Sequence, residues 1–162
     1  MPIPRSIEQF LTDQHVVYSV IPHRPAYTAQ EEAAVAHVPG RHWAKTVACL
    51  ADDRPILAVV PASSLVDLDR LRDVAGARDV RLASEREFQR LYPDCDVGAM
   101  PPLGPLYGQP VFLDRTLTGE NEIVFEAGSH TDAVKMKYDD FARVVRPTVG
   151  DFGRPPRVPI ET

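Results

Sequence analysis

The sequence predicts a mixed α+β fold, in which a curved, largely antiparallel mixed sheet is surrounded by helices. Short β-branched segments and amphipathic segments follow one another without strict alternation, and hairpin-like strand pairs outnumber crossover connections. Neither G-x-G-x-x-G nor G-x-x-x-x-G-K-[ST] occurs, so a doubly wound nucleotide-binding fold is not predicted. With 162 residues, 44% of them hydrophobic, we expect one domain over residues 1–147 and a proline-rich tail at 148–162.

In the first third of the chain, capping-box patterns predict where helices start, and apolar runs predict strands. A Ser or Thr followed three residues later by Gln or Glu is typical of a helix start. The turn ADDRP separates two apolar runs, which predicts a hairpin buried on both faces. In chain order we expect a helix capped by Ser6, a strand at 15–21, a helix opened by Thr28, and hairpin strands at 44–50 and 56–60.

The rest of the chain continues the mixture of strands and helices. Helical spacing of Leu68, Leu71 and Val74 predicts a helix that Gly76 ends. We further expect a strand at 80–82, a helix capped by Ser84, strands at 110–114, 122–127 and 133–137, and a helix at 138–145. After Pro147 the chain has little to bury, so we expect its end to be mobile.

Composition narrows the class of function. The net charge of −5 argues against broad nonspecific nucleic-acid binding, which needs many phosphate contacts at once, although a local contact with one nucleotide end stays open. No run approaches the roughly 20 apolar residues of a membrane span, and the start of the chain lacks the apolar core of a signal peptide. Two cysteines without metal-ligand spacing predict free thiols, no metal site and a cytoplasmic protein.

The stretch DVGAMPPLGPLYG at 96–108 combines glycines and prolines with few polar side chains. Glycine permits close backbone approach and Pro101-Pro102 fixes the path, so Gly98, Ala99 and Met100 could present N–H groups in one direction. Such donors stabilise the oxyanion of acyl transfer. The alternative is a rigid connector between a helix and a strand.

Lys45 and His130 are the side chains with the most evident chemistry. Lys45 interrupts the apolar run AKTVACL, so its ammonium either faces a cleft that binds an anion or snorkels at the sheet edge. Gly128-Ser129-His130 forms a turn between two strands, and His130 is expected as a turn residue or ligand contact. A Cys95–His130 nucleophile pair is a weaker alternative.

Five motifs, in chain order, give the sequence a resemblance to the YbaK/prolyl-tRNA-synthetase editing-domain family of aminoacyl-tRNA deacylases. They are residues 27–31 (YTAQE), 44–46 (AKT), 65–76 (LVDLDRLRDVAG), 96–104 (DVGAMPPLG) and 127–132 (AGSHTD). The similarity runs from about Ser6 to Pro147. It implies a free-standing enzyme that hydrolyses the ester of mischarged tRNA in trans, with Ala-tRNA(Pro) or another small mischarged residue as substrate.

The resemblance also implies roles for individual residues. The glycine–proline loop would hold the ester carbonyl through main-chain groups while a water attacks, assisted by the ribose 2′-OH, and Lys45 would contact the terminal phosphate. The implied catalytic residues are Lys45, Gly98, Ala99, Met100 and His130, and the implied substrate-binding residues are Tyr27, Thr28, Pro101, Pro102, Gly104, Gly128 and Ser129. Neither a metal nor a cofactor is implied.

The implied partner is the CCA acceptor end of aminoacyl-tRNA, and prolyl-tRNA synthetase or the elongation machinery would be further partners. Two other functions stay open at this point. One is a relative of the editing domain that binds tRNA or protein without hydrolysis. The other is a hydrolase that depends on Cys95.

Overall fold

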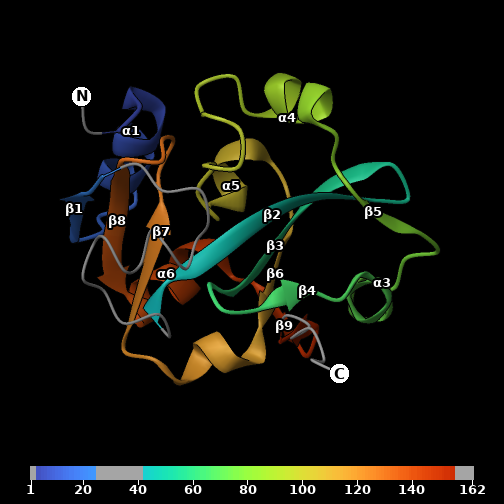
Figure 1. Cartoon of the computed structure of the whole chain (residues 1–162). Helices are drawn as coiled ribbons and strands as arrows, with labels where there is room; N and C mark the ends of the chain where they lie inside the picture. Colours follow the sequence, from blue (N-terminus) through green and yellow to red (C-terminus); the bar gives the residue numbers. More distant parts are fainter. Residues whose placement is uncertain (1–2, 25–41, 156–162) are drawn as a thin grey trace, which may run out of the picture.

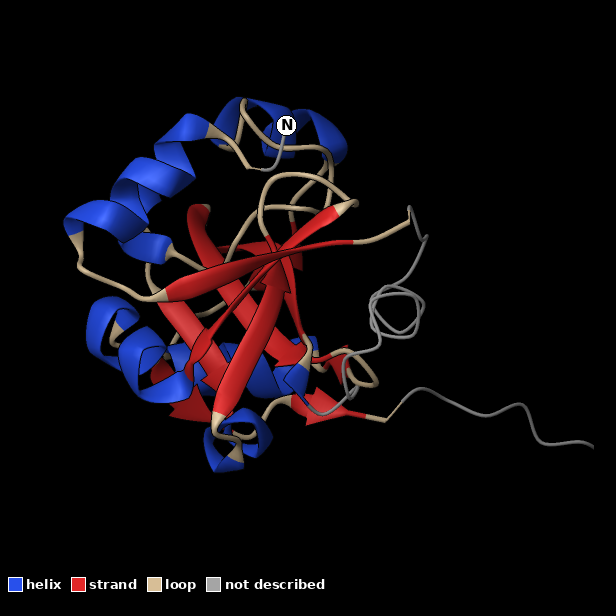
Figure 2. Ribbon diagram, turned by 90° about the vertical axis from the view of Figure 1, so that its left-hand side faces the viewer, coloured by secondary structure: helices blue, strands red, loops and turns tan. Residues whose placement is uncertain are grey.

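The computed structural model describes residues 3–24 and 42–155, and it confirms the predicted α+β fold. Strands form a five-stranded sheet, a three-stranded sheet and a two-stranded ribbon, and helices lie on the outside (Figures 1 and 2). Among the described residues no helix is long and apolar enough to cross a membrane. The helix expected from Thr28 lies outside the described residues.

The five-stranded sheet is built on the predicted hairpin. Its order is β5 (Val80–Leu82), β2 (Ala44–Ala51), β3 (Arg54–Pro61), β6 (Val111–Asp114) and β9 (Thr148–Gly150). The first two pairings are antiparallel and the last two are parallel. Asp52 and Asp53 have φ angles of 48° and 65°, the left-handed conformation that a tight two-residue hairpin turn requires.

The second sheet is antiparallel and joins chain segments that are far apart in the sequence. Its order is β1 (Tyr18–Pro22), β8 (Asp132–Lys137) and β7 (Glu122–Glu126). A single parallel bridge between Trp43 and Val124 connects the start of β2 to β7. The two sheets therefore meet beside the position at which Lys45 enters its strand.

The described helices are α1 (Arg5–Asp13), α3 (Leu68–Ala75), α4 (Glu85–Leu91), α5 (Gly104–Tyr107), η2 (Arg115–Gly119) and α6 (Tyr138–Val145). Side-chain capping groups mark the start of some of these helices but not of α1, α5 or α6. Ser84 and Glu87 form the predicted capping box of α4, and Gly76 ends α3 with a φ of 65°. The expectation that Ser6 caps α1 was wrong. Pro4 stands at that position, and the Ser6 hydroxyl donates to Asp94 instead.

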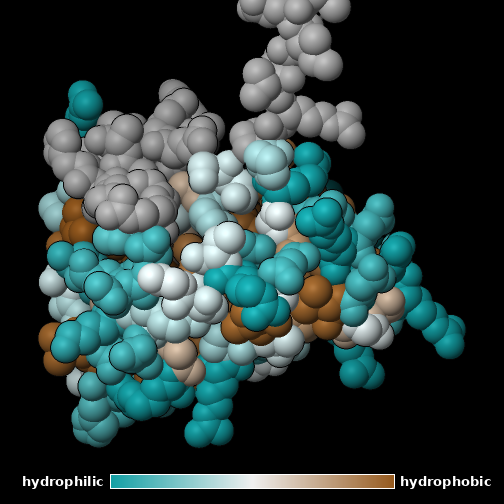
Figure 3. Space-filling view, turned by 90° about the horizontal axis from the view of Figure 1, so that it is seen from below, coloured by the Kyte–Doolittle hydropathy of each residue, from teal (hydrophilic) through white to brown (hydrophobic). Residues whose placement is uncertain are grey.

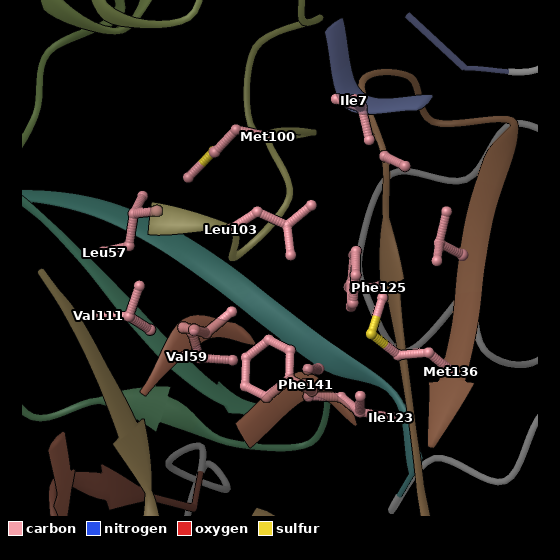
Figure 4. Close-up of a cluster of buried hydrophobic side chains, with 14 of the residues drawn as sticks. Ile7, Leu57, Val59, Met100, Leu103, Val111, Ile123, Phe125, Met136 and Phe141 are labelled. Atoms are coloured by element: carbon pink, nitrogen blue, oxygen red, sulfur yellow. The ribbon is translucent and has the colours of Figure 1, made fainter. Parts of the chain in front are cut away.

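The main core fills the space between the two sheets, where side chains of both meet α6 and the proline-rich loop (Figure 4). Strand β3 is buried on both faces, as predicted: Leu57 and Val59 contribute to this core, whereas Ile56, Ala58 and Val60 contribute to a second core beneath α3. This division follows the two-residue period of a strand. The face seen in Figure 3 is mainly hydrophilic, with apolar side chains in small separate groups.

Two expectations about the chain ends were wrong. The first strand starts at Tyr18 rather than at residue 15, because His15 adopts a φ of 57° and Val17 is 83% exposed. The segment after Pro147 is not a tail with little to bury, at least through residue 155. Strand β9 pairs with β6, and β10 (Gly153–Arg154) pairs with β4 (Leu65–Val66).

The last described segment is held by a buried side chain and a buried carboxylate. Phe152 is fully buried against the second core. Asp114 accepts hydrogen bonds from the backbone N–H groups of Phe152 at 3.2 Å and Gly153 at 2.7 Å. The end of β6 thus fixes the chain beyond β9.

We predict that Phe152→Ala lowers the free energy of unfolding by about 3–5 kcal/mol, the usual loss for a large buried aromatic side chain. Denaturant unfolding of the purified variant measures this loss. Val17→Ala is the control, because Val17 is exposed, and it should change stability by less than about 0.5 kcal/mol. A loss below about 1 kcal/mol for Phe152→Ala would mean that the segment after β9 contributes little.

Candidate active site

A cleft of about 660 Å³ opens between the two sheets and the proline-rich loop. Its walls come from the start of β2, the turn after β3, the connection from β5 to α4, the loop at 97–100 and the end of β7. Four of the predicted site residues line it: Lys45, Gly98, Met100 and His130. These four residues come from three distant parts of the sequence and face one space.

Lys45 brings a positive charge to the cleft. Its Nζ donates to the carbonyl oxygen of Ser64 at 2.5 Å, in the turn that follows β3. Burial lowers the pKa of Lys45, because the charged form loses hydration. An ammonium has three N–H donors, so this single carbonyl leaves donors for an anionic group in the cleft. Of the two alternatives that the sequence leaves open for Lys45, this placement favours the cleft over the sheet edge.

The glycine–proline loop is held by main-chain hydrogen bonds to the turn after β7. Gly128 N–H donates to the Ala99 carbonyl at 2.7 Å, and Asp96 N–H donates to the Gly128 carbonyl at 2.8 Å. Ala99 N–H donates to the Asp96 carbonyl at 2.9 Å, so the expectation that it faces a ligand was wrong. Among the described residues, the backbone N–H groups of Gly98 and Met100 donate to no main-chain carbonyl.

The apolar side chains of this loop belong to the core, which answers why the loop contains so few polar residues. Met100 is 2% exposed and Leu103 is fully buried, and both pack in the main core (Figure 4). Pro101, Pro102 and Gly104 are buried as well and are not among the described residues that line the cleft. A Cβ at Gly104 would lie 2.2 Å from the Gln109 carbonyl oxygen, so only glycine fits there. These residues position the loop.

Gly128 and Ser129 also position main chain. Gly128 has a φ of 104°, and a Cβ there would lie 2.6 Å from two ring carbons of Pro4. The Ser129 hydroxyl donates to Asp132 Oδ2 at 3.2 Å within the turn. Neither residue is among the described residues that line the cleft. Tyr27 and Thr28 lie outside the described residues.

His130 connects the turn after β7 to the loop. Its Nε2 lies 2.8 Å from the Val97 carbonyl oxygen, which can only accept, so Nε2 carries the proton of this bond. The other ring nitrogen, Nδ1, lies 4.0 Å from Glu126 Oε2. The imidazole therefore faces the cleft with its orientation fixed by the loop.

Glu126 and His23 complete this end of the site, and the sequence analysis missed both. Glu126 lines the cleft although it is only 6% exposed, and its Oε1 lies 2.7 Å from His23 Nε2. A carboxylate in the apolar strand EIVFEA could have signalled a functional position, because buried acids are rare unless paired. No pattern around His23 indicates that it is this partner.

Cys95 is not among the described residues that line the cleft. Its sulfur lies 3.8 Å from the Tyr107 hydroxyl, and burial raises the pKa of the thiol. The nucleophilic thiolate is therefore disfavoured at neutral pH. Among the described residues, no group of three or more His, Cys, Asp or Glu side chains could hold a metal ion.

Comparison with known proteins identifies the class of protein that this fold and cleft define. The model of the aminoacyl-tRNA editing domain matches residues 23–144, which is most of the chain. The chain therefore belongs to the aminoacyl-tRNA editing-domain family, as its motifs predicted.

The chain is also similar to a named deacylase from two bacterial strains. The chain is 31% identical over 104 residues to the multifunctional Ser/Thr-tRNA deacylase ProXp-y of Escherichia coli strain K12 and of strain O157:H7. The match covers 61% of this chain and only 59% of the length of those relatives.

Two crystal structures share the fold. A hypothetical protein superimposes with a TM-score of 0.82 at 19% identity, covering 93% of this chain and all of the other. A candidate trans-editing enzyme for prolyl tRNA synthetase superimposes with a TM-score of 0.78 at 21% identity, covering 93% of this chain and 96% of the other.

Proposed function

We propose that the protein hydrolyses the ester bond of mischarged aminoacyl-tRNA in trans. The observation that carries the proposal is the cleft in which the Lys45 ammonium and the exposed backbone of Gly98 face the same space. Membership of the editing-domain family supports it. The ligand would be the CCA acceptor end, so the net charge of −5 is no obstacle, because few phosphates need be bound.

The chemistry assigned to the cleft is hydrolysis assisted by main-chain groups. Lys45 would bind the phosphate of the terminal nucleotide as a point charge. Of the three N–H groups predicted to face a ligand, those of Gly98 and Met100 remain as candidates. They would stabilise the ester oxyanion while water attacks the carbonyl carbon. The neighbouring ribose 2′-OH would assist the attack. This route needs no covalent intermediate on a protein side chain.

For the substrate we propose Ala-tRNA(Pro) or another small mischarged amino acid. The relative ProXp-y is named as a Ser/Thr-tRNA deacylase, so seryl and threonyl esters belong in the same comparison. An apolar pocket separates residues that differ by one methylene or hydroxyl by only about 1–3 kcal/mol, so overlapping substrates are expected. Purified protein incubated with alanyl, seryl and threonyl esters of several tRNAs, tRNA(Pro) included, tests this ranking. Prolyl-tRNA synthetase or the elongation machinery are the proposed further partners.

A non-catalytic module that binds tRNA or protein is the rival function, and absence of deacylation across that substrate panel would favour it. The presence of both Lys45 and the glycine loop in one cleft favours the enzyme. A thiol-dependent hydrolase has less support, because burial favours the thiol form of Cys95 and Cys95 is not among the described residues that line the cleft.

Lys45→Ala should lower kcat/KM for deacylation at least about tenfold, because it removes the cation assigned to the phosphate. Steady-state deacylation of the preferred aminoacyl-tRNA measures the loss. Lys135→Ala is the matched control, since Lys135 lies on β8, pairs with Glu122 and is 40% exposed. Equal activity of the Lys45 variant and this control would remove Lys45 from the mechanism.

Gly98→Val should also lower kcat/KM at least about tenfold, equivalent to about 1.4 kcal/mol of transition-state stabilisation. Gly98 has a φ of 82°, which a β-branched residue rarely adopts, so the main chain of the loop must move. The comparison variant is Gly119→Val, because a Cβ at Gly119 meets no atom within 4 Å. Melting and deacylation are measured together, and a loss that merely follows unfolding would contradict the assigned role.

Cys95→Ser should retain at least about half of the wild-type kcat/KM, because a buried thiol with a raised pKa supplies little thiolate. The same assay after thiol alkylation provides a second readout. A folded but inactive Cys95→Ser variant would restore the covalent mechanism.

A further inference from the structure

Thr46 places a side-chain hydroxyl in the wall of the cleft, and the proposed hydrolysis gives this group no role. The residue follows Lys45 in β2, is 9% exposed, and lines the cleft. Among the residues that the structure describes, its hydroxyl forms no hydrogen bond, and it is not completely enclosed by protein atoms. Because a largely buried hydroxyl is normally hydrogen-bonded, this one is available to a ligand in the cleft.

The edge of β2 beside Thr46 is open. Strand β3 pairs with the opposite edge of β2 over its whole length. On the open side, β5 pairs only with Cys49–Ala51, and the Ala83 N–H extends this contact to the Ala48 carbonyl at 2.9 Å (Figure 1). Between the Trp43 bridge to β7 and Ala48, none of the described strands pairs with this edge. A ligand in the cleft can therefore contact both faces of β2.

The two faces of β2 meet different parts of the site. Successive residues of a strand alternate between faces, so Lys45 lies on one face, whereas Ala44, Thr46 and Ala48 lie on the other. Ala44 and Ala48 belong to the main core together with Met100 of the glycine–proline loop. Thr46 therefore lies on the side of β2 that faces the loop proposed to hold the ester, and Lys45 contacts the turn after β3.

This placement puts Thr46 beside the acyl group rather than the nucleotide. In the proposed reaction one ribose hydroxyl is esterified, the other assists the attack of water, and Lys45 binds the phosphate. The side chain of the acyl group is left for Thr46. The neighbours of Thr46 on this face are two alanines, which leave room for a short side chain, and the cleft wall continues with the apolar Phe88 and Met100.

We infer that Thr46 is a specificity-determining residue, whose hydroxyl binds a hydroxyl on the side chain of the acyl group. This inference rests on the proposed deacylase function and names a substrate class within it: hydroxyl-bearing esters are preferred over apolar esters of the same size. A threonine hydroxyl both donates and accepts, so it can pair with a second hydroxyl in either direction. An apolar isostere would leave Thr46 unpaired, and sites that bind a substrate hydroxyl discriminate strongly against such analogues.

The test compares tRNA(Pro) esterified with serine and with α-aminobutyrate, in which a methyl group replaces the serine hydroxyl. Each rate is divided by the uncatalysed rate of the same ester. The wild-type protein should accelerate hydrolysis of the seryl ester at least about fivefold more. In Thr46→Val, which keeps the shape but loses the hydroxyl, this ratio should fall to about one or below. Thr46→Ser keeps the hydroxyl, so its ratio should stay within about twofold of wild type.

Thr148→Val is the matched control, because Thr148 also lies in a strand but is exposed and is not among the described residues that line the cleft. It should keep the wild-type ratio. A wild-type ratio of about one or less would overturn the inference and leave the deacylase function intact, and that comparison needs no variant.

An unchanged ratio in a folded Thr46→Val variant would also overturn the inference, because Thr46 would then act on a group that both esters share, such as the attacking water or the α-amino group. Hydrolysis of other aminoacyl-tRNAs but of neither of these esters would overturn the inference alone. Hydrolysis of no aminoacyl-tRNA would overturn the proposed function as well.

Discussion

Two main-chain hydrogen bonds between the glycine–proline loop and the turn after β7 hold the cleft together. They join Gly128 to Ala99 and Asp96, and they set both walls that carry Gly98 and His130. They require a left-handed φ at Gly128, where a side chain would collide with Pro4 at the start of α1. The loop, the turn and the first helix are therefore one packing unit, and the geometry of the cleft depends on all three.

The loop contributes to the core and to the cleft at the same time. Met100 and Leu103 are buried between the sheets, whereas Gly98 is exposed two residues before Met100. Its backbone path is fixed by burial of apolar side chains, so few polar side chains are needed to hold it. If the N–H groups of Gly98 and Met100 act as proposed, this packing preorganises them without the entropic cost of ordering a flexible loop on binding.

Local patterns predicted most of the fold but less of the cleft. The Ser84 capping box, the Asp-Asp turn and the apolar runs located helices and strands to within a few residues, because these signals act over short distances. The pairing of β9 with β6 and the burial of Phe152 depend on contacts with distant residues, and a proline-rich segment gives no sign of them. The His23–Glu126 pair spans 103 residues, so only the buried glutamate could have been suspected from the sequence.

The sheet connections also determine when the chain can fold during synthesis. Strand β1 pairs with β8, so Tyr18 has no strand partner until Met136 has been synthesised. Strand β9 adds residues 148–150 to the edge of the other sheet, and Asp114 accepts from two backbone N–H groups that lie almost forty residues later, at Phe152 and Gly153. Such nonlocal pairing slows folding, because the entropy of closing a long loop is lost before the strand contacts form that compensate for it. A ribosome-bound chain that ends before Gly153 cannot complete these pairings, so apolar faces of both sheets stay exposed. The cleft therefore forms late, together with the two completed sheets.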